Sequence, residues 1–161
     1  MGQSGGKWSE VEELSGEYGF SGTFEHTLDD KGRLTIPSSF RADFADGAVL
    51  RKGTADGSIE ILPRSSWNLF LKKLKDISKT DVRGQRWVTL QLATATTVEL
   101  DKAGRVLLGS ELRSFAELAA GPVVVTGALD RLKVWEPKRW AAMETEGMEE
   151  LDDYVYEKYQ I

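Results

Sequence analysis

Two short stretches of the chain place an aspartate four residues before an arginine, with a glycine just before the arginine. "TLDDKGRLTI" (residues 27–36) holds Asp29 and Arg33, and "ELDKAGRVLL" (99–108) holds Asp101 and Arg105. A carboxylate that accepts hydrogen bonds from a guanidinium can hold that group in one orientation. The rest of the guanidinium fork then matches phosphate oxygens or the edge of a guanine base. The four side chains are therefore candidates for binding a polyanion.

The spacing of four fits a β-hairpin with a three-residue loop at 30–32, in which Gly32 adopts the left-handed conformation. This register sets three pairs opposite one another: Asp29 with Arg33, Leu28 with Leu34, and His26 with Ile36. Alternation puts the apolar residues on one face and the acid–arginine pair on the other. In the second stretch, which has Gly104 in its loop, alternation separates an apolar face from a polar face in the same way. Leu107 is the exception, because it is an apolar residue on the polar face. Lys31 and Lys102 lie in the two loops, where they could add phosphate contacts.

The same pair also has a purely structural interpretation. A cross-strand ion pair steadies a hairpin by roughly 0.2–1 kcal/mol without any ligand. A duplicated hairpin inherits its stabilising pair as well as its function. The sequence alone leaves both interpretations open.

An internal repeat determines where the two stretches lie. Aligning residues 28–41 with 100–113 gives six identities in fourteen positions: Leu28/Leu100, Asp29/Asp101, Gly32/Gly104, Arg33/Arg105, Ser38/Ser110 and Arg41/Arg113. The likeness continues between residues 49–67 and 123–140. Each copy has the pattern of a strand, a tight turn, a strand, a short helix, a strand, a turn and a strand. Between the copies, apolar residues at helical spacing predict one helix within 64–81, and a second is expected at 81–93.

Composition excludes several classes of protein. The chain has no cysteine and one histidine, which rules out thiol chemistry and makes a Ser-His-Asp triad or a histidine metal cluster a poor interpretation. It has no apolar run of 18 residues, and its start lacks the pattern of a secretory signal. We expect no enzymatic activity, no cofactor, no small-molecule substrate and no membrane partner.

Charge is spread unevenly along the chain. The net charge is −5, yet residues 21–140 hold 19 basic and 15 acidic groups between two acidic ends. Residues 64–86 are the most basic segment, with seven basic and two acidic side chains. The simplest interpretation is a solvated helix face. The alternative is a second surface for DNA or for an acidic neighbour, such as the acidic tail of the same or another protomer.

At the repeated stretches the sequence resembles the MraZ family. "GTFEHTLDDKGRLTIPSSFR" (22–41) is similar to the N-terminal signature of that family. "TVELDKAGRVLLGSELRSFAEL" (97–118) with "PVVVTGALDRLKVWEPKRW" (122–140) is similar to its second half. The resemblance runs from about residue 20 to residue 140. It implies a cytoplasmic, nucleoid-associated bacterial transcription regulator that acts on the division and cell-wall gene cluster.

The resemblance also implies an architecture and a mechanism. The expected fold is mostly β with flanking helices: two SpoVT–AbrB-like repeats closed into a pseudo-symmetric swapped-hairpin (double-split) barrel, with a helical connector and a C-terminal helix. The expected ranges are an acidic, poorly ordered extension at 1–18, repeats at 20–67 and 95–140, the connector at 68–94, and a C-terminal helix with an acidic tail at 141–161. Homo-oligomeric rings would present their hairpins to tandem repeats in promoter DNA.

Carried over by position, the expected DNA contacts are Lys31, Arg33, Lys102 and Arg105. Asp29 and Asp101 would position the arginines, and Gly32 and Gly104 would form the turns. The second copy departs from the family pattern, because Gly109 stands where proline is usual and Lys31 aligns with Ala103. Two rival functions remain: an antitoxin-like or other protein-binding module, and an architectural oligomer whose acid–arginine pairs are internal struts.

Overall fold

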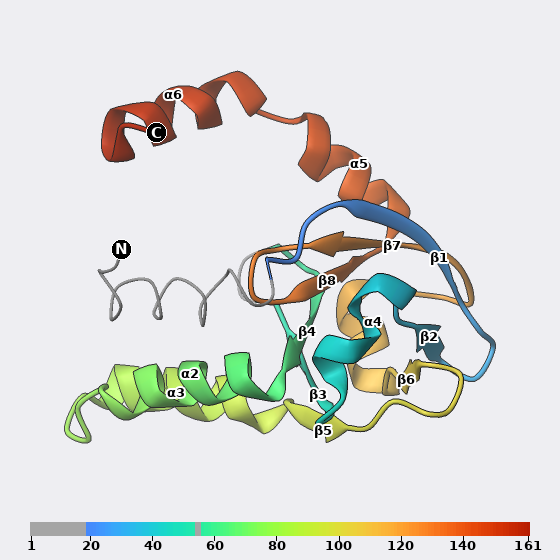
Figure 1. Cartoon of the computed structure of the whole chain (residues 1–161). Helices are drawn as coiled ribbons and strands as arrows, with labels where there is room; N and C mark the ends of the chain where they lie inside the picture. Colours follow the sequence, from blue (N-terminus) through green and yellow to red (C-terminus); the bar gives the residue numbers. More distant parts are fainter. Residues whose placement is uncertain (1–18, 54–55) are drawn as a thin grey trace, which may run out of the picture.

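The structure is a computed structural model of the 161-residue chain, and it describes residues 19–53 and 56–161. The expected extension at 1–18 lies outside the described residues. Within them, eight strands form one antiparallel sheet in the order β5-β3-β4-β8-β7-β1-β2-β6 (Figure 1). The strands are β1 (Thr23–Leu28), β2 (Arg33–Thr35), β3 (Ala48–Lys52), β4 (Ile59–Pro63), β5 (Thr96–Val98), β6 (Arg105–Leu107), β7 (Gly121–Gly127) and β8 (Leu132–Trp135).

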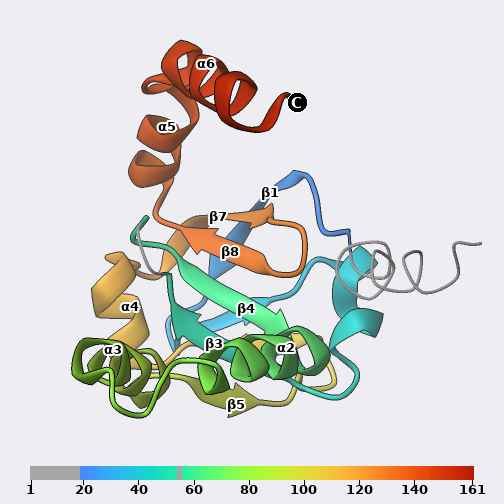
Figure 2. The same cartoon turned by 90° about the vertical axis from the view of Figure 1, so that its left-hand side faces the viewer.

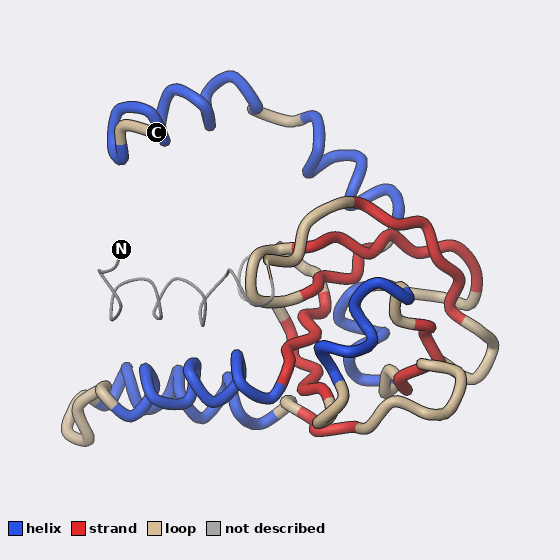
Figure 3. The backbone as a smooth tube through the Cα atoms, viewed as in Figure 1, coloured by secondary structure: helices blue, strands red, loops and turns tan. Residues whose placement is uncertain are grey.

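Much of the strand pairing joins one repeat to the other. β1 pairs along its whole length with β7, and its counterpart β5 pairs with β3. The equivalent strands β2 and β6 pair with each other, as do β4 and β8. The sheet curls into a nearly closed barrel (Figure 3). The predicted pseudo-symmetric swapped-hairpin barrel is thereby confirmed.

One part of the expected hairpin register is wrong. Leu28 lies opposite Leu34 as predicted, but His26 lies opposite Val123 of β7 rather than Ile36. The two strands of the hairpin separate just beyond the loop, because β1 continues along β7 while β2 turns to β6. The amide of Ile36 consequently donates to the carbonyl of Gly104 at 2.9 Å.

The barrel interior is filled by the residues that alternation placed on the apolar face. Five of these side chains are at most 1% exposed: Leu28, Leu34, Ile36, Val106 and Leu108. Burying a side chain of this size contributes about 1.5–3 kcal/mol. Leu107, which interrupts the polar face of the second hairpin, is exposed as its position predicts.

Six helical segments accompany the sheet in the described residues: η2 (Ser38–Phe44), α2 (Arg64–Lys75), α3 (Val82–Ala93), α4 (Ser110–Ala116), α5 (Pro137–Thr145) and α6 (Met148–Tyr159). α2 and α3 form the predicted helical connector, a hairpin of helices that projects from the barrel (Figures 1 and 2). Trp67 of α2 packs against Val49 and Leu62 of the sheet. The side chain of Asp81 caps α3 by accepting from the amide of Gly84 at 2.9 Å. No helix in the described ranges is long and apolar enough to cross a membrane.

The C-terminal segment consists of two helices, and the second, α6, carries most of the acidic residues of the expected tail. α5 packs on the barrel, where the rings of Trp140 and Trp135 lie 5.5 Å apart. Gly147, with a φ of +65°, separates α5 from α6. A positive φ is strained for other residues, so the glycine permits the change of direction. No residue of α6 is buried, and Figures 1 and 2 show the helix standing away from the barrel.

A buried ionic network ties the connector to the barrel. One oxygen of Glu60 accepts from Arg51 at 2.6 Å and from Arg131 at 2.7 Å. Arg51 is 2% exposed, lies 4.6 Å from the centre of the Phe70 ring, and also donates to Gln91 of α3. Burial, opposed by the charge of Glu60, lowers the pKa of Arg51. The three side chains, from β3, from β4 and from the residue just before β8, thus depend on one another.

Candidate functional site

The two hairpin loops lie side by side at one end of the barrel, and the α2–α3 hairpin projects from the other side (Figure 1). The pairing of β2 with β6 brings them together. Two hydrogen bonds link the loops crosswise: Ile36 donates to Gly104 at 2.9 Å, and Leu108 donates to Gly32 at 2.8 Å. The fold therefore presents both candidate sites in the same region of the surface.

In the first loop, Asp29 organises both the turn and the arginine. Its Oδ1 accepts from the backbone amides of Lys31 (2.9 Å) and Arg33 (2.8 Å). Its Oδ2 accepts from Nε of Arg33 at 2.7 Å. Gly32 adopts a φ of +83°, as the three-residue loop requires. One carboxylate thus fixes the loop backbone and the guanidinium together.

The second loop has the same geometry. Oδ1 of Asp101 accepts from the amides of Ala103 and Arg105, both at 2.9 Å, and Oδ2 accepts from Nε of Arg105 at 2.8 Å. Gly104 has a φ of +78°. The absence of the proline and of the aligned lysine has not altered the acid–arginine pair.

The bond to aspartate leaves the terminal nitrogens of each arginine available for other hydrogen bonds. The bond to aspartate uses Nε, and no hydrogen bond of the two terminal nitrogens occurs within the described part of the chain. The side chains of Arg33 and Arg105 are both 34% exposed. Lys31 and Lys102 are exposed beside them. This arrangement can donate paired hydrogen bonds to phosphate or to the acceptors of guanine.

Hydrogen bonding lowers the pKa of both aspartates. The main cause is the amide of the following arginine, Arg33 for Asp29 and Arg105 for Asp101, with further contributions from the guanidinium itself. These interactions outweigh the desolvation that raises the pKa. The carboxylates therefore stay charged at pH values where an ordinary aspartate begins to take up protons.

The pH dependence follows from the direction of this shift. A lowered pKa means that the carboxylate contributes stability above the ordinary value of about 3.9, and that the contribution is lost as pH falls through the lower folded value. We expect carbon-13 NMR titrations of the Asp29 and Asp101 carboxyls to show midpoints below about 3.9. Arg33→Ala should move the Asp29 midpoint upward and leave that of Asp101 in place. A midpoint at or above the ordinary value would contradict the observed bonding.

Two further arginines at this end of the barrel were assigned no role from the sequence. Nε of Arg41 donates to the carbonyl of Ile36 at 3.0 Å, and Nε of Arg113 donates to that of Leu108 at 2.9 Å. Each packs on the glycine of the opposite loop, since a Cβ on Gly104 would lie 2.5 Å from Nε of Arg41. The sequence does contain a sign of their importance, because the two arginines occupy equivalent positions in the alignment of the two repeats.

The end of the barrel is accordingly rich in cations. Six basic side chains gather at the two loops: Lys31, Arg33, Arg41, Lys102, Arg105 and Arg113. Within residues 19–53 and 56–161, no cluster of three or more His, Asp or Glu side chains could hold a metal ion. The chemistry available at the loops is recognition of an anion by hydrogen bonding and charge.

Comparison with known proteins shows the family of the chain. A family model described as "MraZ protein, putative antitoxin-like" matches residues 20–87 and 92–154, which covers both repeats. The gap between the two matched segments, residues 88–91, lies in the second half of α3, near the end of the connector.

Named relatives are similar over most of their length. The chain is 39% identical over 123 residues to "Transcriptional regulator MraZ" of Thermomicrobium roseum, which covers 76% of this chain and 85% of that protein. It is 37% identical over 134 residues to the protein of the same name from Pediococcus pentosaceus, covering 83% and 92%. For the Thermus thermophilus protein of that name the identity is 37% over 120 residues, covering 74% and 83%. On its sequence and its two repeats, this chain belongs to the MraZ family.

Proposed function

We propose that the protein is a transcriptional regulator that binds tandem promoter repeats of the bacterial division and cell-wall gene cluster through its two arginine-bearing loops. The observation that carries this proposal is the acid–arginine geometry, which occurs twice at one end of the barrel. The terminal guanidinium nitrogens have no hydrogen-bond partner among the residues that the structure describes. The members of the family that are compared above are named transcriptional regulators, and the family is not a family of enzymes.

The loops fit a β-ribbon that enters the major groove. Arg33 and Arg105 would read guanine O6 and N7, and Asp29 and Asp101 would hold each fork in position. Lys31 and Lys102 would contact phosphates, which position the protein without reading sequence. Arg41 and Arg113 would keep the two loops in a fixed relation.

A single pair of loops makes few contacts, so assembly is part of the proposed mechanism. A homo-oligomeric ring that presents several loops to evenly spaced repeats would gain affinity through effective concentration. Binding of this kind depends on the number of repeats and on salt, because each neutralised phosphate releases counterions. Such a protein would act in the cytoplasm, on the nucleoid.

Fluorescence anisotropy on DNA from upstream of the protein's own gene, with one, two and three repeats, tests the proposal. Arg33→Ala with Arg105→Ala should raise Kd at least about 100-fold on three repeats, since each bidentate guanine contact is worth about 1–3 kcal/mol. The native mass and the melting temperature should stay close to wild type. Lys138→Ala, an exposed lysine of α5, is the control that removes one positive charge without touching the loops.

Other outcomes would favour the rival functions. If the double variant lost its oligomer or melted at a lower temperature with no specific change in DNA affinity, the pairs would be structural struts. If wild type showed no preference for the repeats at any salt concentration, the proposal would be wrong. An antitoxin-like, protein-binding role would then be the better interpretation.

A further inference from the structure

We propose that α6 of one protomer docks on the α2–α3 hairpin of a second copy of the chain. This inference rests on the proposed function, because it names the contact that would build the oligomer. The contact lies outside the DNA-reading loops, so the two ideas can fail separately.

α6 presents an apolar surface with no partner among residues 19–53 and 56–161 of its own protomer. Met148, Leu151, Val155 and Tyr159 recur at spacings of three and four, which places them in one stripe along the helix. Met148, Leu151 and Tyr159 are each more than half exposed. The hydrogen bonds recorded for the side chains of α6 and its C-cap stay within this segment. A stripe of this kind is typical of a helix that packs on another surface.

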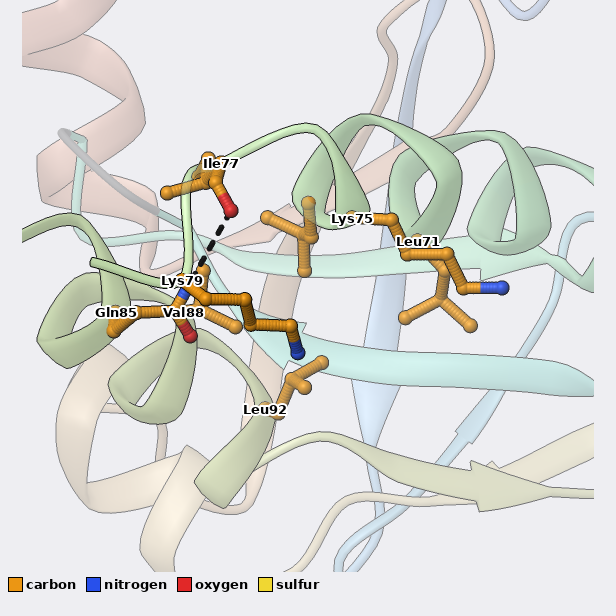
Figure 4. Close-up of a pocket in the computed structure, with 8 residues that line it drawn as sticks. Leu71, Lys75, Ile77, Lys79, Gln85, Val88 and Leu92 are labelled. Atoms are coloured by element: carbon orange, nitrogen blue, oxygen red, sulfur yellow. Dashed lines mark hydrogen bonds between the residues drawn. The ribbon is translucent and has the colours of Figure 1, made fainter. Parts of the chain in front are cut away.

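The α2–α3 hairpin offers a surface of matching chemistry. A pocket of about 200 Å³ opens between its two helices (Figure 4). Its apolar lining is Leu71, Leu74, Ile77, Val88 and Leu92. Lys75 and Lys79 lie beside these residues, and Gln85 closes one end by donating to the carbonyl of Ile77. An apolar side chain could fill this pocket, and carboxylates on either side of it could form ion pairs with the two lysines.

Charge complementarity identifies α6 as the occupant. α6 carries five carboxylates and one lysine, and Glu149 and Asp152 border its apolar stripe. The hairpin segment 64–86 carries seven basic side chains and two acidic ones. None of the seven forms an ion pair within the described part of the chain: Arg64, Lys72, Lys73, Lys75, Lys79, Arg83 and Arg86. Unpaired opposite charges on two exposed apolar surfaces favour their association.

The positions of the two surfaces require a second copy. In Figures 1 and 2 α6 lies at the top of the view and the α2–α3 hairpin at the bottom, so these two segments do not meet within this protomer. A contact between different surfaces of identical protomers is heterologous, and it generates a ring when the rotation closes. The arginine-bearing loops lie away from both surfaces in Figure 1 and would remain accessible.

DNA is the other polyanion that a basic hairpin could bind. Phosphates would use the cations of the hairpin but would leave its apolar pocket and the α6 stripe exposed to water. The observations therefore favour α6, and DNA binding at the hairpin becomes one outcome of the test.

Charge reversal on each side tests the contact. Glu149→Lys with Asp152→Lys reverses the border of α6, and Lys72→Glu with Lys75→Glu reverses the hairpin. Each full-length variant alone should lose the oligomer in native mass spectrometry and sedimentation, with self-association weakened at least about 10-fold. An equimolar mixture of the two should recover it, because each reversed surface then meets its opposite. Leu151→Ser with Val155→Ser should also lose the oligomer without any change of charge.

The controls separate this interface from general effects of charge and from the loops. Glu25→Lys with Asp46→Lys makes the same change in net charge as the α6 variant, but on the barrel, and should keep the wild-type mass. A monomeric wild type, unchanged masses in both reversed variants, or no recovery in the mixture would overturn the proposal. So would a hairpin variant that keeps its mass and loses only DNA affinity. All masses are measured without DNA, so failure of DNA recognition leaves this result intact.

Discussion

Glu60→Gln is expected to lower the free energy of unfolding by about 3–5 kcal/mol, the usual loss when one partner of a buried ion pair is removed. Glu60 is 4% exposed, and one of its oxygens accepts from both Arg51 and Arg131. Glutamine keeps the shape but not the charge. It would leave the buried Arg51 without a negatively charged partner, beside the neutral Gln91 and the Phe70 ring. Urea denaturation followed by tryptophan fluorescence would measure the loss.

Two further variants show whether burial is the cause. Asp130 also pairs with Arg131, at 2.9 Å, but it lies nearer the surface. Asp130→Asn should therefore cost at most about 1 kcal/mol. Replacing the network as a whole, with Arg51→Met, Glu60→Leu and Arg131→Met, should cost less than Glu60→Gln alone, because no charge is left buried without a partner. If Glu60→Gln cost no more than Asp130→Asn, the network would not be the buried unit that the structure shows.

The local chemistry of the loops could be predicted from the sequence because it depends on neighbours in the chain. A glycine three residues after an aspartate, followed at once by an arginine, determines the loop length and the left-handed turn. Both copies then place the carboxylate beside the guanidinium, as the distances of 2.7 and 2.8 Å confirm. The function of that pair is not determined by its geometry, and it stays a proposal.

The pairing between repeats could not be derived from alternation alone. The pattern in β1 is equally satisfied by a long hairpin with β2 and by the observed pairing with β7. Which of these two pairings β1 adopts depends on how the two repeats close into one barrel, and that is a property of the whole chain. The error at His26 and Ile36 follows from this, since the hairpin was extended beyond the point where its strands separate.

Charged residues with structural roles were hard to recognise for a related reason. Arg51 and Glu60 lie in strands that are buried on both faces. In such strands the alternation of polar and apolar residues cannot predict an internal ion pair. Arg41 and Arg113 act on the loop of the opposite repeat, far away in sequence. Their identity at equivalent repeat positions was the only local sign, and it does not specify what they contact.

Gly127→Ala is expected to destabilise the barrel by about 3–5 kcal/mol, as much as the loss of a large buried aromatic side chain. A Cβ at this position would lie 2.2 Å from the backbone nitrogen of Ser21, and no side-chain rotation can relieve a clash with backbone. The segment that contains Phe20 must therefore move away from β7. That segment is held by a bridge between Phe20 and Leu129 and by a bond from Gly127 to the carbonyl of Gly22. Its displacement would expose the ring of Phe20, which is 2% exposed and stacks on Phe44.

A double-mutant cycle shows whether this displacement is the mechanism. Phe20→Ala alone should cost a similar amount, about 3–5 kcal/mol. If both changes act by releasing the same segment, the double variant should cost clearly less than the sum of the two. Gly109→Ala is the matched control, because a Cβ there meets nothing within 4 Å and its φ of −63° suits any residue. If the two changes in the free energy of unfolding were fully additive, β7 rather than the segment that contains Phe20 would move in response to the added Cβ. The packing of that segment on the barrel would then not depend on the glycine.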